Sequence, residues 1–310
     1  MITALAGGVG AARFLRGLVE VVPPRDVTAI VNTGDDVVLH GLHVSPDLDT
    51  LTYTIADAVN PETGWGLAGE SWRVMDELER LGGEAWFRLG DRDLATHLYR
   101  TQRLAGGESL SMVTAALAAS FGLTVRLLPM SNDRVETRVT VEPDGEIGFQ
   151  EYFVGRRHAV PVTAVRFDGV ESATAAPGVL ESLADAERVV ICPSNPIVSI
   201  GPILAVPGMR AAVEAARART VAVSPIVAGA ALKGPADRML IELGHEASVV
   251  GIARLYAPLA RALVVDEADA ALAAAVEAEG MSCVVTPTIM RSPVEARALA
   301  RVVLDEVLAA

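Results

Sequence analysis

The sequence predicts an α/β protein, namely a Rossmann-like three-layer fold with a parallel sheet, a helical insert and a small antiparallel β insert. Short apolar runs rich in β-branched residues recur along the 310 residues, and each run ends in Gly, Pro, Asn or Ser before a segment of helical periodicity. This alternation is typical of a parallel sheet covered by helices on both faces. Hydrophobic residues make up 51% of the chain, which is enough to build an extensive core.

Several segments fit the strand pattern, and polar residues follow most of them. The predicted strands are residues 2–6, 27–31, 125–128, 188–192, 220–223, 262–265 and 282–285. Polar clusters come after the first five of these, at residues 7–10, 32–36, 131–133, 194–199 and 224–225. Because ligands of open α/β sheets bind beyond the carboxyl ends of the strands, we expect these clusters to form one site.

Two stretches interrupt this core. Residues 50–121 have mainly helical patterns and are expected to form a lid or cap over the core. In the other, alternating apolar residues, a Pro143-Asp144-Gly145 turn and further strands over 147–154 and 162–167 predict an antiparallel meander that could contact a second subunit. The expected division is a core of residues 1–49, 122–133 and 169–310, a helical cap of residues 50–121 and a meander of residues 134–168.

Composition and charge exclude several classes of function. The formal net charge of −13 argues against binding nucleic acid or an anionic membrane surface, since both require a basic face. The two cysteines, Cys192 and Cys283, are too few for a disulfide framework or a cysteine zinc site. No basic leader begins the chain, and no apolar run approaches the roughly 18 residues of a membrane span. We therefore expect a cytoplasmic protein.

Two loops have the composition of phosphate-binding turns. Gly8 and Gly10, between the first strand and its helix, permit a tight turn and close approach of backbone to phosphate. Arg13 stands where a dinucleotide fingerprint has its third glycine, and the lysine of a P-loop is missing. The proline-rich loop over 193–202 offers polar side chains before a helix. Both loops favour a nucleotide or phosphate role, while plain turn geometry remains the alternative.

Acidic residues gather after the second strand. Asp35 and Asp36 follow Asn32, and Asp47 and Asp49 lie a few residues further on. Carboxylates with substrate phosphates are the usual oxygen ligands of Mg²⁺, so the four acids predict a magnesium site. Taken singly, each acid is better explained by an Asx turn or a helix cap.

The segment Gly90-Asp91-Arg92-Asp93-Leu94-Ala95-Thr96-His97 combines two acids, a cation, a hydroxyl and an imidazole at one predicted helix start. Asp91 suits the N-cap, and Asp93 suits the positive end of the helix dipole. Asp93 and His97 are four residues apart and share a face. A well-capped surface helix is the alternative to a functional site here.

Taken in order, these motifs resemble the 2-phospho-L-lactate transferase family of deazaflavin coenzyme F-420 biosynthesis. The resemblance implies a homodimer that uses Mg²⁺ to transfer a phosphorylated three-carbon acid from a guanosine diphosphate-linked donor to the deazaflavin alcohol Fo. It implies GMP and either F-420-0 or dehydro-F-420-0 as products. Lys233 is the only lysine and alanine is abundant, which indicates a high-GC bacterium. Family members from such bacteria are linked with the phosphoenolpyruvate donor, so the expected product is dehydro-F-420-0.

The resemblance also assigns roles to residues. It implies that Asp35 and Asp49 hold the metal, and that Asp91 and Arg92 are catalytic candidates, with Asp91 a candidate general base. The Fo site is expected at Asp49, Arg92, Thr96 and His97. The guanosine nucleotide is expected at Gly8, Gly10, Asn32, Ser194, Asn195 and Ser199.

Two other functions stay open on the residues alone. A nicotinamide-dependent oxidoreductase of the NAD type would explain the glycine turn, but it would not explain the missing third glycine or the crowded acids. A non-catalytic regulator that binds a sugar nucleotide would share the glycine loop and a paired acid, but it would not be expected to carry the segment over 90–97. Binding of Fo would separate the transferase from both.

Overall fold

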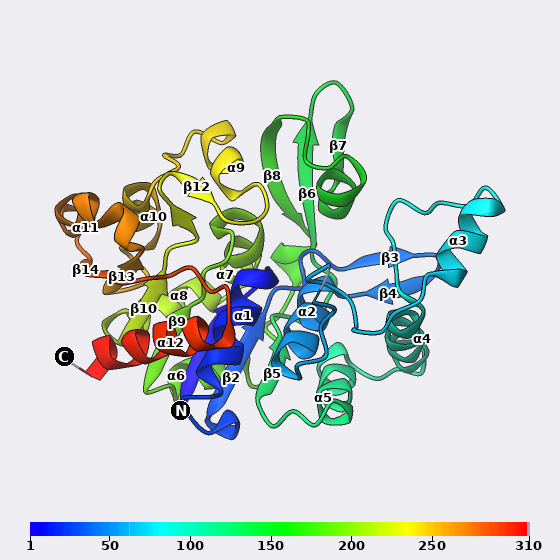
Figure 1. Cartoon of the computed structure of the whole chain (residues 1–310), viewed down its shortest axis with the longest axis horizontal. Helices are drawn as coiled ribbons and strands as arrows, with labels where there is room; N and C mark the ends of the chain where they lie inside the picture. Colours follow the sequence, from blue (N-terminus) through cyan, green and yellow to red (C-terminus); the bar gives the residue numbers. More distant parts are fainter. Residues whose placement is uncertain (62, 309–310) are drawn as a thin grey trace.

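The computed structural model describes residues 1–61 and 63–308, and within these residues seven parallel strands form the central sheet. The strands run in the order β14-β13-β10-β9-β1-β2-β5 (Figure 1). Their bounds are β1 Ile2–Ala6, β2 Val27–Val31, β5 Arg126–Pro129, β9 Arg188–Ile191, β10 Thr220–Val223, β13 Ala262–Val265 and β14 Ser282–Val285. The predicted fold class is confirmed, and the observed strands lie within one residue of the predicted bounds.

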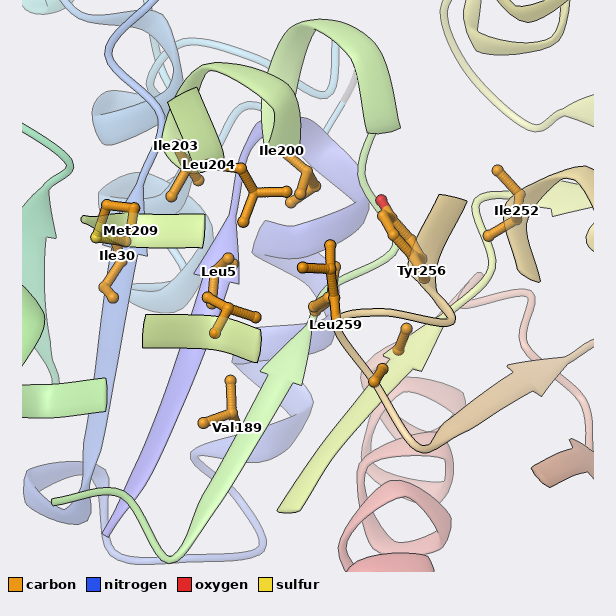
Figure 2. Packing of buried hydrophobic residues seen from close by; sticks show 14 of the residues in the cluster. Leu5, Ile30, Val189, Ile200, Ile203, Leu204, Met209, Ile252, Tyr256 and Leu259 are labelled. Atoms are coloured by element: carbon orange, nitrogen blue, oxygen red, sulfur yellow. The ribbon is translucent and has the colours of Figure 1, made fainter. Parts of the chain in front are cut away.

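Helices cover both faces of this sheet, because strand residues point alternately to either side. On one face Ala4, Ala29 and Val31 pack under α1 (Gly8–Leu18), α2 (Pro46–Ile55), α5 (Leu110–Ser120) and α12 (Pro293–Leu308). On the other face, Leu5 and Ile30 pack against residues such as Ile203, Met209 and Tyr256 (Figure 2). The helices of this second layer are α6 (Val179–Ala184), α7 (Gly201–Ala205), α8 (Met209–Ala215), α9 (Ala236–Glu242), α10 (Val249–Tyr256) and α11 (Ala273–Ala278).

The strand order reverses direction beside β1. From β1 the chain proceeds to β2 and β5 on one side, then returns to β9 and continues outward through β10, β13 and β14 on the other. The loops after the neighbouring strands β1 and β9 therefore lead to opposite sides of the sheet. Their divergence opens a crevice at the carboxyl edge of the sheet. Such a switch point is the usual ligand site of an open α/β sheet.

The antiparallel insert consists of β6 (Glu136–Val141), β7 (Gly145–Gly148) and β8 (Val162–Asp168), in the order β7-β6-β8. The predicted meander is confirmed, but the strand expected over 147–154 is wrong beyond Gly148. A single helical turn, Glu151–Gly155, replaces it. Phe149, Tyr152 and Phe153 pack into the apolar cluster of this insert, and their spacing of three and four residues suits a helical turn better than a strand.

A hairpin that the sequence analysis did not anticipate lies beside the helical cap. Its strands are β3 (Val37–Leu39) and β4 (Leu42–Val44), and it extends away from the sheet toward α3 (Arg73–Arg80) and α4 (Asp91–Ala105) (Figure 1). Leu39 and Val44 pack there in a separate small apolar cluster that includes Met75. The division of the chain into a core and two inserts stays a prediction.

A second two-stranded hairpin, β11 (Ile226–Val227) with β12 (Ala230–Ala231), follows β10. In the described part of the chain, no single helix combines the length and apolar character needed to cross a membrane. Two consecutive segments, Pro196–Ala205 and Met209–Ala215, meet that test of length and composition only together, and they are bent by 97° relative to one another.

Candidate functional site

A cavity of about 900 Å³ lies at the carboxyl edge of the sheet, beside the switch point. Its floor comes from the loops after β1 and β9, its walls from α2, α4 and the turn after β7, and its rim from the loop after β12. Four predicted clusters, those after β1, β2, β9 and β10, contribute to its lining, whereas the cluster at 131–133 does not. Chain segments that are distant in sequence thus meet where the topology predicts a ligand site.

The glycine turn after β1 is packed tightly against its neighbours. A Cβ atom on Gly10 would lie 2.2 Å from the carbonyl oxygen of Pro193, so only glycine fits at this position. Gly8 has a φ of +74°, which also favours glycine. The Ser194 hydroxyl donates to the carbonyl of Gly7 at 2.8 Å and thereby joins this turn to the loop after β9. The turn and that loop form one rigid floor.

The start of α1 already faces a carboxylate. The backbone N–H of Gly8 donates to Oδ1 of Asp47 at 2.8 Å, and the Asn32 amide donates to Oδ2 of Asp47 at 2.9 Å. Asn32 is fully buried and does not itself line the cavity. The N-terminus of α1 therefore binds an anion, and that anion is the carboxylate of Asp47. Asp47 was predicted only as one of four acids, because the partners that define this role lie 15 and 39 residues away.

The acids after β2 are crowded and incompletely compensated. Oδ1 of Asp35 and Oδ1 of Asp36 are buried without a hydrogen-bond partner among the described residues. Burial, and then the charge of Asp47, raises the pKa of Asp35 well above its usual range. Burial also raises the pKa of Asp47 to about 6. Buried like charges with free oxygens are the arrangement that a hard divalent cation relieves.

Asp49 is held by a buried arginine that sequence analysis missed. Arg100 is 1% exposed and donates to both carboxylate oxygens of Asp49. The same guanidinium donates to the carbonyl of His43 and contacts Nδ1 of His97, each at 3.2 Å. The spacing of Asp93, His97 and Arg100 along one helix face was the available sequence signal.

Oxygen and nitrogen atoms of Asp49, Asp93 and His97 lie within 4.8 Å of one another, a spacing that could also accommodate a metal ion. Arg100 competes for that role, since its positive charge already compensates Asp49. The ion pair between them also anchors α4 of the cap to α2 of the core. This pair is thus part of the framework beneath the cavity wall.

The first residues of α4 divide between the cavity and the outer surface. Asp93 and His97 line the cavity, whereas Asp91, Arg92 and Thr96 do not. The Asp91 carboxylate accepts from the backbone N–H groups of residues 73 and 74 and so caps α3. The Arg92 guanidinium donates to the carbonyl of Ala68. The predicted catalytic roles of Asp91 and Arg92, and the Fo contact of Thr96, stay predictions for residues outside the lining.

The N–H groups at the start of α4 also have a partner. Those of Arg92 and Asp93 donate to the Glu70 carboxylate at 2.7 and 2.9 Å. The negative charge that the N-terminus of α4 favours is therefore supplied by Glu70 of the same chain.

Of the predicted site residues, the structure brings eight into the cavity lining: Gly8, Gly10, Asp35, Asp49, His97, Ser194, Asn195 and Ser199. The lining also contains aromatic and basic residues that sequence analysis did not assign, namely Trp65, Trp86, Phe87, Phe149, Phe153, Arg13, Arg88, Lys233 and Arg291. The rings of Phe149 and Phe153 are stacked, with centroids 5.6 Å apart. Only tertiary contacts could have added these residues, since they come from separate segments.

A single family model, described as 2-phospho-L-lactate transferase CofD, matches residues 2–298. The chain belongs to the CofD family. It is therefore an enzyme of the transferase type that serves coenzyme F-420 biosynthesis, as the resemblance implied. The oxidoreductase and the non-catalytic regulator are not favoured.

Curated relatives of this CofD-family chain match it over almost its whole length. A phosphoenolpyruvate transferase of Streptomyces griseus is 49% identical over 309 residues, which cover 98% of this chain and 97% of that protein. Proteins of the same name from Kitasatospora aureofaciens and Mycolicibacterium smegmatis are 50% and 41% identical, and cover 96% and 98% of this chain. These matches cover 94% and 98% of the two relatives.

The fold of the CofD-family chain also occurs in a solved structure. A Bacillus halodurans protein described as a member of the UPF0052 family aligns with a TM-score of 0.62 at 16% identity, and the alignment covers 98% of both chains. At this identity the likeness supports the fold alone.

Proposed function

We propose that this CofD-family enzyme transfers the phosphoenolpyruvyl group from a guanosine diphosphate-linked donor to the hydroxyl of Fo, forming dehydro-F-420-0 and releasing GMP. The observation that carries the proposal is the single cavity that combines a glycine turn, free buried carboxylates and an aromatic wall. The names of the relatives support the choice of the enolpyruvyl group over the lactyl group. A cytoplasmic homodimer is part of the proposal.

The donor is proposed to bind over the floor of the cavity. Gly8, Gly10, Ser194, Asn195 and Ser199 would hold its guanosine diphosphate moiety, as the resemblance implies. Asn32 contributes indirectly, because it fixes the Asp47 carboxylate beside the glycine turn. Of the backbone N–H groups in the first turn of α1, Asp47 accepts only that of Gly8, so the others suit a phosphate of the donor.

Asp35 and Asp49 are proposed to hold a Mg²⁺ ion, with Asp36 and Asp47 beside them. The free Oδ1 atoms of Asp35 and Asp36 fit an oxygen-seeking cation. Asp49 shares its carboxylate with Arg100, so it can offer only the lone pairs that the guanidinium leaves free. When bound, Mg²⁺ supplies positive charge that stabilises the phosphoryl group in transfer.

The acceptor is proposed to bind against the aromatic side of the cavity. Trp86, Phe87, Phe149 and Phe153 offer flat apolar surface that suits a deazaflavin ring. Asp49 and His97 line the same cavity as these rings. The proposed acceptor and donor sites therefore share one cavity.

The choice of donor is tested with the purified protein, Fo and each of three guanosine diphosphate-linked acids, phosphoenolpyruvate, phospholactate and phosphoglycerate. We expect GMP release and a product whose mass equals that of dehydro-F-420-0, with turnover of the enolpyruvyl donor exceeding that of the others. The donors differ only in small groups near a carboxylate, so the preference is expected to be about 10-fold to 200-fold. Preferred turnover of the lactyl donor would overturn the choice of donor, and absence of turnover with all three would overturn the transferase proposal.

Stability is expected to depend on pH and Mg²⁺ through Asp47. Burial raises its pKa to about 6 in the folded chain, above the ordinary aspartate value of 3.8, so the unfolded state releases this proton first as pH rises. Without metal, the contribution of Asp47 to the free energy of unfolding should therefore fall by about 2 kcal/mol between pH 4 and pH 7. Millimolar Mg²⁺ should restore stability most at pH 7, because the ion binds the carboxylate without its proton.

Thermal unfolding at several pH values, with and without Mg²⁺, measures this effect. The Asp47→Asn variant is the control, since it should lose this part of the pH dependence. An identical pH dependence of unfolding in the variant and the wild type would contradict the prediction.

A further inference from the structure

Asp93 presents an unengaged carboxylate oxygen at the cavity wall. It lies in the first turn of α4, is 6% exposed and lines the cavity. The Tyr53 hydroxyl donates to Oδ1 at 2.7 Å, and Nε2 of His97 lies 3.3 Å from the same oxygen. Both contacts thus fall on Oδ1, and within the described residues no donor engages Oδ2. The second oxygen remains available to a ligand.

The orientation of His97 follows from Arg100. A guanidinium only donates hydrogen bonds, so its contact with Nδ1 at 3.2 Å requires that nitrogen to be the acceptor. The ring proton then lies on Nε2, which faces Asp93. Arg100 is itself held by Asp49, so a buried series of contacts runs from Asp49 through Arg100 and His97 to Asp93 and Tyr53. The hydrogen bond from Tyr53 holds Oδ1 of Asp93, while Nε2 of His97 lies beside that oxygen at 3.3 Å without a hydrogen bond of its own.

The same contacts keep Asp93 ionised. Burial acts to raise the pKa of Asp93, but the contacts from His97 and Tyr53 outweigh it and hold the pKa below its usual range. A carboxylate of low basicity still suits phosphoryl transfer, where the attacking hydroxyl loses its proton late and mainly needs to be oriented. Asp93 thus combines a fixed position, a negative charge and a free acceptor atom.

We propose that Asp93 is the catalytic residue that orients and deprotonates the attacking hydroxyl of the acceptor alcohol, while Tyr53, His97 and Arg100 are positioning residues. This inference rests on the proposed transferase function. The alcohol oxygen forms a bond to the phosphorus that carries the three-carbon acid, and its proton passes to Oδ2 of Asp93. The bond from that phosphorus to the bridging oxygen breaks, and the electron pair leaves with GMP. Asp93 then releases the proton to solvent.

Other carboxylates near the cavity are engaged differently. Asp91, two residues away on the same helix, caps α3 and lies outside the lining. Asp49 accepts two hydrogen bonds from Arg100, and Asp47 accepts from Gly8 and Asn32. Asp35 also lines the cavity and has an oxygen without a hydrogen bond, but it is the proposed metal ligand. Among Asp47, Asp49, Asp91 and Asp93, only Asp93 lines the cavity with an oxygen that receives no hydrogen bond from the described residues.

The test compares the wild type, Asp93→Asn and Asp57→Asn under saturating Mg²⁺. Asp57 is an exposed acid that pairs with Arg16 outside the cavity, so its variant controls for the loss of one negative charge. We expect kcat of Asp93→Asn to fall by about 10²-fold to 10⁴-fold, the usual contribution of a general base. The KM for both substrates, the affinity for Fo measured by its fluorescence, and the Mg²⁺ concentration for half activation should each change less than about threefold, as for a group that acts only in the transition state.

Three results would overturn the inference while the wild type remains active. Retention of kcat in Asp93→Asn would mean that no proton passes to this residue. A large rise in the required Mg²⁺ concentration would make Asp93 a metal ligand, and loss of Fo affinity with unchanged kcat would make it a binding residue only. An inactive wild type would instead overturn the proposed function.

A second variant guards against a purely structural loss. Tyr53→Phe keeps the ring and removes the hydroxyl that holds Oδ1. We expect a smaller fall in kcat, about 10-fold, with Fo affinity and thermal stability close to those of the wild type. If Asp93→Asn fails to fold, an unchanged kcat in Tyr53→Phe would overturn the positioning role, and with it the proposal.

Discussion

Replacement of Asp35 by Asn should abolish most of the turnover without harming the fold. Oδ1 of Asp35 is buried without a partner among the described residues, and burial with the nearby Asp47 raises its pKa. A metal ion contributes several kcal/mol to phosphoryl transfer, so loss of one ligand should lower kcat by about a thousandfold, or about 4 kcal/mol. The measurement is GMP release at saturating donor and Fo over a range of Mg²⁺ concentrations.

The same substitution should leave stability unchanged or raise it in the absence of metal. Asn has the shape of Asp but carries no charge, so it removes the repulsion from Asp47 and from Asp36. Thermal unfolding in EDTA should show a midpoint at or above that of the wild type. Asp57→Asn is again the matched control for charge. Wild-type turnover by Asp35→Asn, or full activity of the wild type in EDTA, would exclude the metal site.

Replacement of Arg100 by Met should cause a large loss of stability. Arg100 is 1% exposed and supplies the counter-charge of Asp49, which is itself buried. Removal of one partner from a buried ion pair leaves the other charge uncompensated and typically costs about 3–5 kcal/mol. Urea unfolding followed by circular dichroism, with thermal unfolding as a second measurement, gives the size of the loss.

The double variant Arg100→Met with Asp49→Asn separates charge from packing. It removes both members of the pair, so much of the lost stability should return, although kcat should not. Arg100→Lys keeps a positive charge but cannot form both hydrogen bonds to Asp49, and it should lie between the wild type and Arg100→Met. A loss below about 1 kcal/mol in Arg100→Met would show that the pair is not needed for the docking of α4.

Local sequence patterns were sufficient for the sheet and for part of the site. The seven strands of the central sheet are short and bounded by turn residues, and those in its middle are buried on both faces, so each could be recognised within its own few residues. Gly8, Asp35 and Ser194 were predicted at one edge because each follows a strand, and a parallel sheet places such positions together. The structure brings all three into one cavity.

Local sequence patterns did not predict roles that depend on a hydrogen-bond partner distant in sequence. They also did not predict short strands that are stable only when paired with each other. The hairpin of β3 and β4 was not predicted, because its strands have only three residues each and are stabilised by the cap. Asp91 was predicted as a catalytic candidate and Asp93 was given no site role, yet Asp91 caps α3 and Asp93 lines the cavity. Their difference arises from the docking of α4 against α2.

Local patterns and ordered motifs predicted the α/β fold, the edge of the sheet at which the site lies and the family to which the chain belongs. Which carboxylates are compensated follows from contacts between distant segments, since Arg100 reaches Asp49 across 51 residues and Gly8 reaches Asp47 across 39. Periodicity and turn residues act over one or two turns of chain and are visible in a single segment. The charge compensation and burial of a carboxylate depend on groups that meet only after folding. The pKa of each site carboxylate therefore cannot be predicted from its own segment.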